Sequence, residues 1–389
     1  MHHDIHEFTG SEWKMKKKII IIGSGIAGAS TAYFLAKNKQ DVTIIDRDDP
    51  GQATNAAAGI VCPWLSQRRN KDWYQLVKAG ARMYPKLVKS LARDGLTDIG
   101  YHQVGALHLH QDQEKLQAMK VRAEKRRLDA PEIGDIGILT PQETKNKFPI
   151  LEDKYSSIYV SGAARVNGRK LRDALIKGAQ NHHAQRMKGA ATLKVSGKTI
   201  TGVVVDNRQE ITADTVIATT GAWMRELLTP LGITFRIEPQ RAQILHVQLP
   251  DNIGDTSLWP VVKPPNNQYM LTFPDKRVVL GATYENNINL DYRITVGGMH
   301  EIMTKAMEIA PALQEAAIIE ARMGFRPVTP GYLPVIGRLP GFHGLLLTNG
   351  LGSTGLTMGP FIGLQLAKLA MNQQTDIDLQ AYDVQKAMD

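Results

Sequence analysis

A short apolar run that leads into three spaced glycines constrains the fold of this chain more than any other feature. Four isoleucines are followed by glycines in the pattern G-x-G-x-x-G: Gly23, Gly25 and Gly28. The next residues, 29–39, have the composition of a helix, and DVTIID at 41–46 predicts a second strand. Strand, glycine turn, helix and strand form a βαβ unit, which is typical of a parallel sheet that binds a dinucleotide.

Each glycine of this pattern has a physical role in such a unit. Gly23 makes the tight turn, Gly25 lets the backbone approach a pyrophosphate, and Gly28 lets the helix pack closely on the strand. The N-terminus of the helix then faces the phosphate charge. We expect Asp46, at the end of the second strand, to bind ribose hydroxyls.

Two other interpretations of the apolar run are less consistent with the residues. Three lysines before it and small residues after it resemble a secretory signal, and an apolar run also raises the question of a membrane helix. Consecutive isoleucines that end in glycines favour a buried strand instead. The apolar stretch is also interrupted by polar residues and ends near Lys37, so it is too short to span a bilayer.

Composition narrows the class of protein further. The chain has 389 residues, enough for two domains or one large interleaved body. Cys62 is the only cysteine, which excludes an intrachain disulfide, a thiolate zinc site and an iron–sulfur ligand set and favours a reducing compartment. His108 and His110 share a strand face, but no third ligand is evident, so we expect no metal. The net charge of +9 is scattered, and the run KVRAEKRR is interpreted as a solvated helix face rather than a nucleic-acid site.

The rest of the chain alternates between segments predicted to be helices and segments predicted to be strands. After Asp46, the small residues of GQATNAAAG suit either a wall against a flat ligand or a tightly packed alanine helix. Helices are predicted near 71–95, at QDQEKLQAMKVRAEKRRLDA, and at GRKLRDALIKGAQNHH, and a β-meander leads to a buried strand that runs into Gly221. Longer alternating strands between 226 and 320 predict an antiparallel sheet. A strand at 345–348 then meets a second glycine-rich turn and an apolar helix.

Several of these segments together resemble the FAD-dependent D-amino acid oxidase superfamily, which includes glycine oxidase and the bacterial D-amino acid dehydrogenases. The resemblance covers residues 16 to about 385 and rests on an ordered set of motifs: GSGIAGAS, IIDRDDPGQATNAAAG, ADTVIATTGAW, PQRAQI, RVVLGAT, GFRPVTPGYLPVIG and NGLGSTGLTMGP. It implies an α/β Rossmann-type FAD-binding domain interleaved with an antiparallel-sheet substrate domain. We expect the FAD-binding domain at 15–70, 150–225 and 320–389, the substrate domain at 71–149 and 226–319, and a disordered extension at 1–14.

The same resemblance implies which residues hold non-covalent FAD. Besides Gly23, Gly25 and Gly28, they fall into six groups. In the order of the list below, these groups lie at the pyrophosphate turn, at the adenosine ribose, along the flavin, at the adenine end, at the end of the strand with small residues, and in the loop that contacts the flavin. These residues are Ile26 and Ala27; Asp46 and Arg47; Ala53, Thr54, Ala58, Gly59 and Ile60; Thr192; Gly221; and Leu351, Gly352, Ser353, Thr354, Gly355, Leu356 and Thr357.

Two further residues are implied to act on substrate. Arg326 matches the arginine that forks onto a substrate carboxylate, and Tyr269 matches an active-site tyrosine that assists there. Ser353 stands where glycine oxidase has a second arginine, which brings the flavin loop closer to the dehydrogenases. Cys62 lies far too early to be the cysteine that attaches flavin in sarcosine oxidases.

The implied activity is oxidative deamination of a small amino acid, of the D-amino acid dehydrogenase or oxidase type, with hydride transfer from Cα to flavin N5 and hydrolysis of the imino acid to a 2-oxo acid. The alternatives are a glycine or sarcosine-type oxidase and a flavin-binding subunit without turnover. We expect O2 or a quinone or dye as electron acceptor, no nucleic acid and no transmembrane segment, and the homo-oligomeric state stays open. A cytoplasmic location is expected, with peripheral association at the inner membrane face as the alternative.

Overall fold

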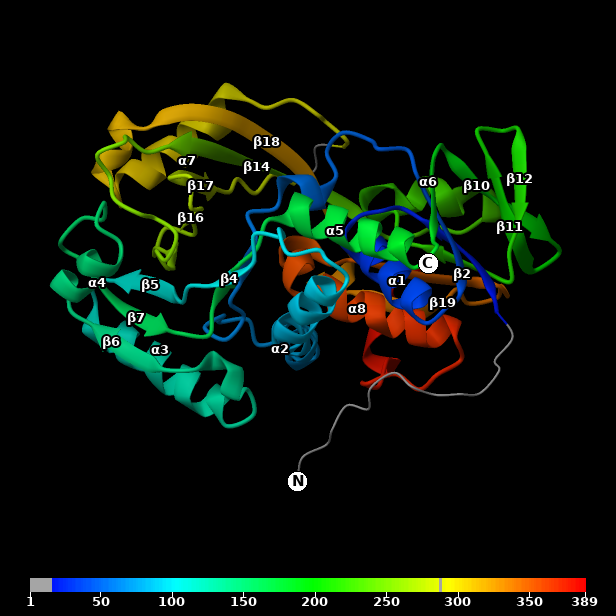
Figure 1. Cartoon of the computed structure of the whole chain (residues 1–389), viewed down its shortest axis with the longest axis horizontal. Coiled ribbons are helices and arrows are strands. Elements are labelled where there is room, and N and C mark those ends of the chain that lie inside the picture. The colour runs from blue at the N-terminus through cyan, green and yellow to red at the C-terminus, as the bar shows by residue number, and fades with distance from the viewer. Residues whose placement is uncertain (1–15, 287–288) are drawn as a thin grey trace.

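The computed structural model describes residues 16–286 and 289–389. The extension predicted to be disordered, residues 1–14, lies outside the described residues. Figure 1 shows two large sheets side by side, with helices packed between and around them. The α/β class and the Rossmann-type unit expected from the sequence are confirmed.

The first sheet has six strands in the order β19-β20-β13-β1-β2-β9. All neighbours are parallel except the edge pair β19 and β20. The glycine motif follows β1, whose residues Ile19, Ile20 and Ile21 are fully buried at the centre of this sheet, so the signal and membrane interpretations do not hold. The strands are β19 (Val335–Arg338), β20 (Leu345–Asn349), β13 (Thr215–Ala218), β1 (Lys18–Ile22), β2 (Asp41–Asp46) and β9 (Gln185–Lys188).

Helices cover one face of this sheet and a small antiparallel sheet covers the other. Alternate isoleucines of β1 enter two different cores, because successive strand side chains point to opposite faces. On the first face, α1 (Ile26–Lys37) packs between α5 (Gly168–Asn181) and α8 (Gly355–Ala370), and α2 (Lys71–Arg93) packs on α8. The second face carries the predicted β-meander, β10 (Ala191–Ser196), β11 (Thr199–Val205) and β12 (Gln209–Thr212), together with α6 (Met224–Leu228).

The second large sheet has eight strands in the order β18-β14-β17-β16-β15-β5-β7-β6. Its neighbours are antiparallel as predicted, except that β15 and β5 pair in parallel. Helix α7 (Val296–Met307) packs on the face that points away from the first sheet. The strands are β18 (Ala317–Val328), β14 (Glu238–Gln248), β17 (Arg277–Gly281), β16 (Tyr269–Thr272), β15 (Val261–Lys263), β5 (Ala106–His110), β7 (Ser156–Val160) and β6 (Ile136–Leu139).

Short elements complete the chain. Strands β3 (Ile60–Val61), β8 (Ala164–Arg165) and β4 (His102–Gln103) form a small sheet, and helices α3 (Gln113–Arg127) and α4 (Pro141–Lys147) lie near β6 and β7. One prediction is wrong in detail: the basic face of α3 is not fully solvated. Arg126 donates to the Ser66 carbonyl at 2.8 Å and lies 4.5 Å from the ring centre of Tyr74, because a guanidinium can pack on an aromatic face.

The predicted division into two domains stays a prediction. Strand β7, expected in the FAD-binding domain, lies in the eight-stranded sheet with the strands of the substrate domain. Helix α2, expected in the substrate domain, packs on α8. The expected boundaries therefore do not match the packing at these two places. Within the described ranges, no helix is both long and apolar enough to cross a membrane. The same ranges contain no group of three or more histidine, cysteine or acidic side chains arranged to hold a metal.

Candidate active site

A cavity of about 830 Å³ lies where the carboxyl ends of β1, β2 and β13 face the eight-stranded sheet. This is the edge at which open α/β sheets bind ligands. The cavity is lined by the glycine turn, residues 52–60, the segment after β13, the strands that carry Tyr269 and Arg326, and residues 348–357. Segments far apart in the sequence therefore form one continuous wall.

The glycine turn is shaped by backbone contacts that exclude side chains. Gly23 has a φ of +98°, and a Cβ there would lie 2.6 Å from the Thr219 carbonyl oxygen. A Cβ at Gly28 would lie 2.0 Å from the Gly23 carbonyl oxygen, so this glycine serves helix packing and does not itself line the cavity. Thr219 supports the turn from β13 by donating to the carbonyls of Ile22 and Gly23 at 3.0 and 2.8 Å.

Helix α1 begins at this turn and presents its N-terminus to the cavity. The first hydrogen bond within the helix runs from the Ala29 N–H to the Gly25 carbonyl, at 2.9 Å. The N–H groups of residues 26–28 therefore have no acceptor within the helix. Ile26 N–H donates to Thr54 Oγ1 at 3.0 Å, which links the turn to the next wall of the cavity. A helix start of this kind favours an anion such as a pyrophosphate.

Acidic residues gather at one end of the cavity. Asp46 is buried and accepts hydrogen bonds from the N–H groups of Ser24 and Asp48 and from Gln52 Nε2. Arg47 beside it is neutralised by Glu226 and Asp49, with N–O distances of 2.5 and 2.7 Å. This end carries no surplus positive charge, which suits the ribose and adenine of a nucleotide rather than its phosphates.

The second glycine-rich turn forms another wall of the cavity. A single 3-10 turn, Gly352–Thr354, leads directly into α8, so a second helix N-terminus faces the same space. Gly352 has a φ of +53°, a backbone conformation that favours glycine. Thr357 Oγ1 donates to the Ile60 carbonyl at 3.0 Å and ties this helix start to β3. The second turn is therefore fixed to the wall that residues 52–60 form.

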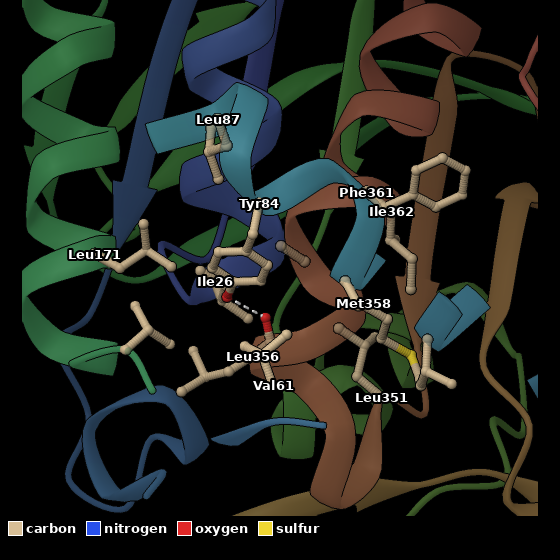
Figure 2. Packing of buried hydrophobic residues seen from close by; sticks show 14 of the residues in the cluster. Ile26, Val61, Tyr84, Leu87, Leu171, Leu351, Leu356, Met358, Phe361 and Ile362 are labelled. Atoms are coloured by element: carbon tan, nitrogen blue, oxygen red, sulfur yellow. Dashed lines mark hydrogen bonds between the residues drawn. The ribbon is translucent and has the colours of Figure 1, made fainter. Parts of the chain in front are cut away.

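Helix α2 supports this second turn from behind. Figure 2 shows the Tyr84 hydroxyl reaching the backbone carbonyl of Leu356, to which it donates at 2.5 Å. A Cβ at Gly80 would lie 2.1 Å from the Thr357 carbonyl oxygen, so the two helices touch backbone to backbone here. The start of α8 is therefore held by close packing as well as by hydrogen bonds.

Arg326 and Tyr269 line the same cavity from the eight-stranded sheet. Arg326 is buried, donates to Gln240 Oε1 at 3.1 Å and to the Thr283 carbonyl at 3.4 Å, and lies 4.3 Å from the ring centre of Tyr284. No acidic residue of the described chain pairs with it. Burial raises the pKa of Tyr269 well above its usual range, against the opposing charge of Arg326, so its phenol is a neutral hydrogen-bond donor.

The structure brings together all of the residues predicted to bind cofactor or substrate, apart from Gly28, along this one cavity. Their individual roles stay predictions. Several other lining residues, two of them inside the quoted motifs, were not predicted as site residues, because their places in the cavity depend on how distant segments pack together. These are Gln52, Arg68, Trp73, Thr219, Lys263 and Tyr284.

The shape and chemistry of the cavity fit a long dinucleotide. Two helix N-termini face it, glycines remove side chains where the backbone lines it, and an acid lies at one end. At Gly221, a φ of +52° favours glycine although nothing lies within 4 Å of a Cβ there. The described residues therefore supply donors for a pyrophosphate and open space for flat rings.

Comparisons with known proteins agree with this geometry. A family model described as FAD dependent oxidoreductase matches residues 18–369. The chain is 56% identical to the uncharacterized oxidoreductase YurR of Bacillus subtilis (strain 168), over 94% of this chain and 98% of that protein. It is 27% identical to glycine oxidase of Pseudomonas aeruginosa, over 95% of this chain and 98% of that protein.

A solved structure is also similar over nearly the full length. The crystal structure of iminodiacetate oxidase from Chelativorans sp. BNC1 has a TM-score of 0.91 and 41% identity, covering 94% of this chain and 98% of that one. Glycine oxidase from Geobacillus kaustophilus, at 23% identity and a TM-score of 0.83 over 95% of this chain and 98% of that one, shares the fold.

Proposed function

This chain belongs to the family of FAD dependent oxidoreductases, and from that premise we propose that it oxidises an amine that carries an N–CH2–COO⁻ unit, held through its carboxylate by Arg326. The cofactor is FAD. The names of the similar proteins support this proposal, since glycine and iminodiacetate both contain that unit. Of the activities expected from the sequence, they favour the glycine or sarcosine type, which was the alternative, over the D-amino acid dehydrogenase or oxidase type.

The observation that carries the proposal is the state of Arg326. Its guanidinium is buried and faces the cavity, yet within the described residues it has no carboxylate partner. A buried cation without a counter-ion is costly, and a substrate carboxylate would supply the missing charge. Gln240 and Thr283 orient the group through one nitrogen and leave other N–H donors for a forked contact.

The remaining residues of the site bind and orient rather than exchange protons. When bound, FAD supplies the two-electron acceptor for oxidation of the C–N bond. Tyr269, beside Arg326, would offer a hydrogen bond to the substrate from a neutral phenol. Among the described lining residues there is no histidine, and the acids lie at the Asp46 end, so the amine must reach the site already neutral. Orientation of the substrate by Arg326 then provides most of the effect of the protein.

Replacement of Arg326 tests the proposal. In Arg326→Leu, reduction of the flavin by glycine, sarcosine or iminodiacetate under anaerobic conditions should slow at least about thirtyfold at low substrate, since losing such a contact costs about 2–5 kcal/mol. Arg326→Lys should recover only part of the rate, because an ammonium cannot form the fork. The exposed Arg338, replaced in the same way, is the control and should react like the parent. Reduction of Arg326→Leu within about threefold of the parent would overturn the proposal.

A further inference from the structure

The substrate end of the cavity is cationic. Four basic residues line the whole cavity: Arg47, Arg68, Lys263 and Arg326. Arg47 is neutralised at the Asp46 end by Asp49 and Glu226, and these two and Asp46 are the acids among the lining residues described. Arg68, Lys263 and Arg326 therefore have no carboxylate partner among the described lining residues, and only Arg326 is assigned to a substrate carboxylate so far.

Strand alternation places Lys263 on the same face of the sheet as Tyr269. In the antiparallel pair β15 and β16, Val262 lies opposite Met270, and both enter the core beneath α7. The next residues, Lys263 and Tyr269, therefore point to the other face, where Tyr269 packs against the core that borders the cavity. Lys263 is a neighbour of Tyr269 across the strands and lines the cavity beside it.

Lys263 is half-buried and has no partner within the structure described. No described residue forms a hydrogen bond or an ion pair with it. Its charge acts on the buried Cys62 and the half-buried His108, whose Sγ and Nε2 lie 3.8 Å apart. Burial raises the pKa of the Cys62 thiol to about 11, and burial and the charge of Lys263 lower the pKa of His108 well below its usual range, so both groups are neutral and neither balances the charge of Lys263.

Arg68 is a weaker candidate for binding an anion. Its Nη2 donates to the carbonyls of Gly331 and Tyr332, and its guanidinium lies 4.7 Å from the ring centre of Trp73. The guanidinium of Arg68 therefore links residues 331 and 332 to the start of α2. Lys263 has no such engagement, and in the order of the strands Tyr269 lies between it and Arg326.

We propose that Lys263 binds a second carboxylate of the substrate, so that the preferred substrate is a secondary amine flanked by two carboxylates. This inference rests on the proposed function, because Arg326 is taken to hold the first carboxylate. The amine nitrogen then lies between the two cations, near Tyr269. A lysine is suited to binding this second carboxylate. Its ammonium group lies at the end of a flexible side chain and can adjust to the position of the anion, whereas the guanidinium of an arginine requires a fixed two-point contact.

Binding of two unreactive ethers tests the inference without turnover. Oxydiacetate and methoxyacetate have an oxygen in place of the nitrogen of iminodiacetate and sarcosine and differ by one carboxylate. Titrated into the FAD-loaded protein and followed by the flavin absorbance, oxydiacetate should bind at least tenfold more tightly than methoxyacetate. Lys263→Met should remove this preference and leave methoxyacetate binding unchanged, and Lys263→Arg should retain most of it. The exposed Lys177, replaced by Met, is the control and should keep the full preference.

The outcomes separate the two proposals. A preference for oxydiacetate that survives in Lys263→Met, or no preference in the parent, would overturn the role of Lys263 while leaving Arg326 untouched. If Arg326→Leu binds both ethers as the parent does, the carboxylate contact of the proposed function fails instead. A turnover measurement gives an independent readout: kcat/KM of Lys263→Met should fall at least tenfold for iminodiacetate and less than twofold for sarcosine.

Discussion

At the scale of single residues, Asp46 links the glycine turn to the loop after β2, and both segments line the cavity. Its carboxylate accepts from Ser24 N–H in the glycine turn and from Asp48 N–H and Gln52 Nε2 in the loop after β2, at 2.6 and 3.0 Å for the last two. The carboxylate is therefore already part of the wall before any ribose contact is added. An acid at the end of the second strand therefore shapes the wall of the cavity, in addition to the ribose contact predicted for it.

Removing this carboxylate should weaken FAD binding. We expect Asp46→Ala to raise the Kd for FAD at least tenfold, because charge-assisted hydrogen bonds of this kind contribute about 1.5–3 kcal/mol. The measurement is a titration of the deflavinated protein with FAD, followed by flavin fluorescence. Asp49→Ala, which removes an acid at the same end of the cavity but only an ion pair with Arg47, is the control. Equal Kd values for the two variants would show that Asp46 is not specifically involved.

The residues themselves predicted the positions that depend on local spacing, and the resemblance to a family added Tyr269 and Arg326, but Lys263, whose position depends on strand pairing, was missed. Gly23 and Gly28 are recognisable because turn and helix packing are set within a few residues. Lys263 is not, since its place beside Tyr269 follows from the register of β15 against β16. The three-residue strand β15 also lacks the length that makes alternation visible.

At the scale of secondary structure elements, the contact between α2 and α8 sets the position of the second helix start. Gly80 of α2 lies against the backbone of Thr357, and Tyr84 one turn later bonds to Leu356. The sequence predicted both helices, but nothing in it indicated that they meet at the flavin loop. Such a contact joins residues 80 and 357, and periodicity reports only which face of each helix is apolar.

Widening this contact should disturb the cavity. Gly80→Ala would place a Cβ 2.1 Å from the Thr357 carbonyl oxygen, so the helices must separate. We expect the free energy of unfolding to fall by about 1–3 kcal/mol and FAD to bind more weakly. Urea unfolding and FAD titration are the measurements. Gly297→Ala, at a helical glycine of α7 with nothing within 4 Å of a Cβ, is the control, and similar losses in both variants would contradict the account.

At the scale of the whole molecule, the cavity lies between two sheets built from interleaved parts of the chain. The strands of the first sheet come from residues 18–46, 185–218 and 335–349, and all eight strands of the second come from the segments between them. The motifs predicted the βαβ unit and the antiparallel sheet. They did not predict that β5 joins β15 in parallel, because such pairing has no local sequence signature.

The cofactor held in this cavity should be released by unfolding. Cys62 is the single cysteine, is buried, and has its thiol pKa raised to about 11 by burial, with Lys263 opposing, so it is poorly suited to attach flavin. We expect yellow protein as purified and all of the flavin in the supernatant after acid precipitation. Flavin that stays with the precipitated chain would contradict non-covalent binding.

We propose above that Arg326 holds an amine with a carboxymethyl group, and that this amine is oxidised while FAD is reduced. The most direct measurement mixes the purified protein with glycine, sarcosine or iminodiacetate in the absence of air and follows the flavin absorbance and the products. We expect at least one of these amines to bleach the flavin and to yield one glyoxylate for each flavin reduced. A flavin that dithionite reduces but none of these amines does, or sarcosine oxidised to formaldehyde without glyoxylate, would contradict the proposal.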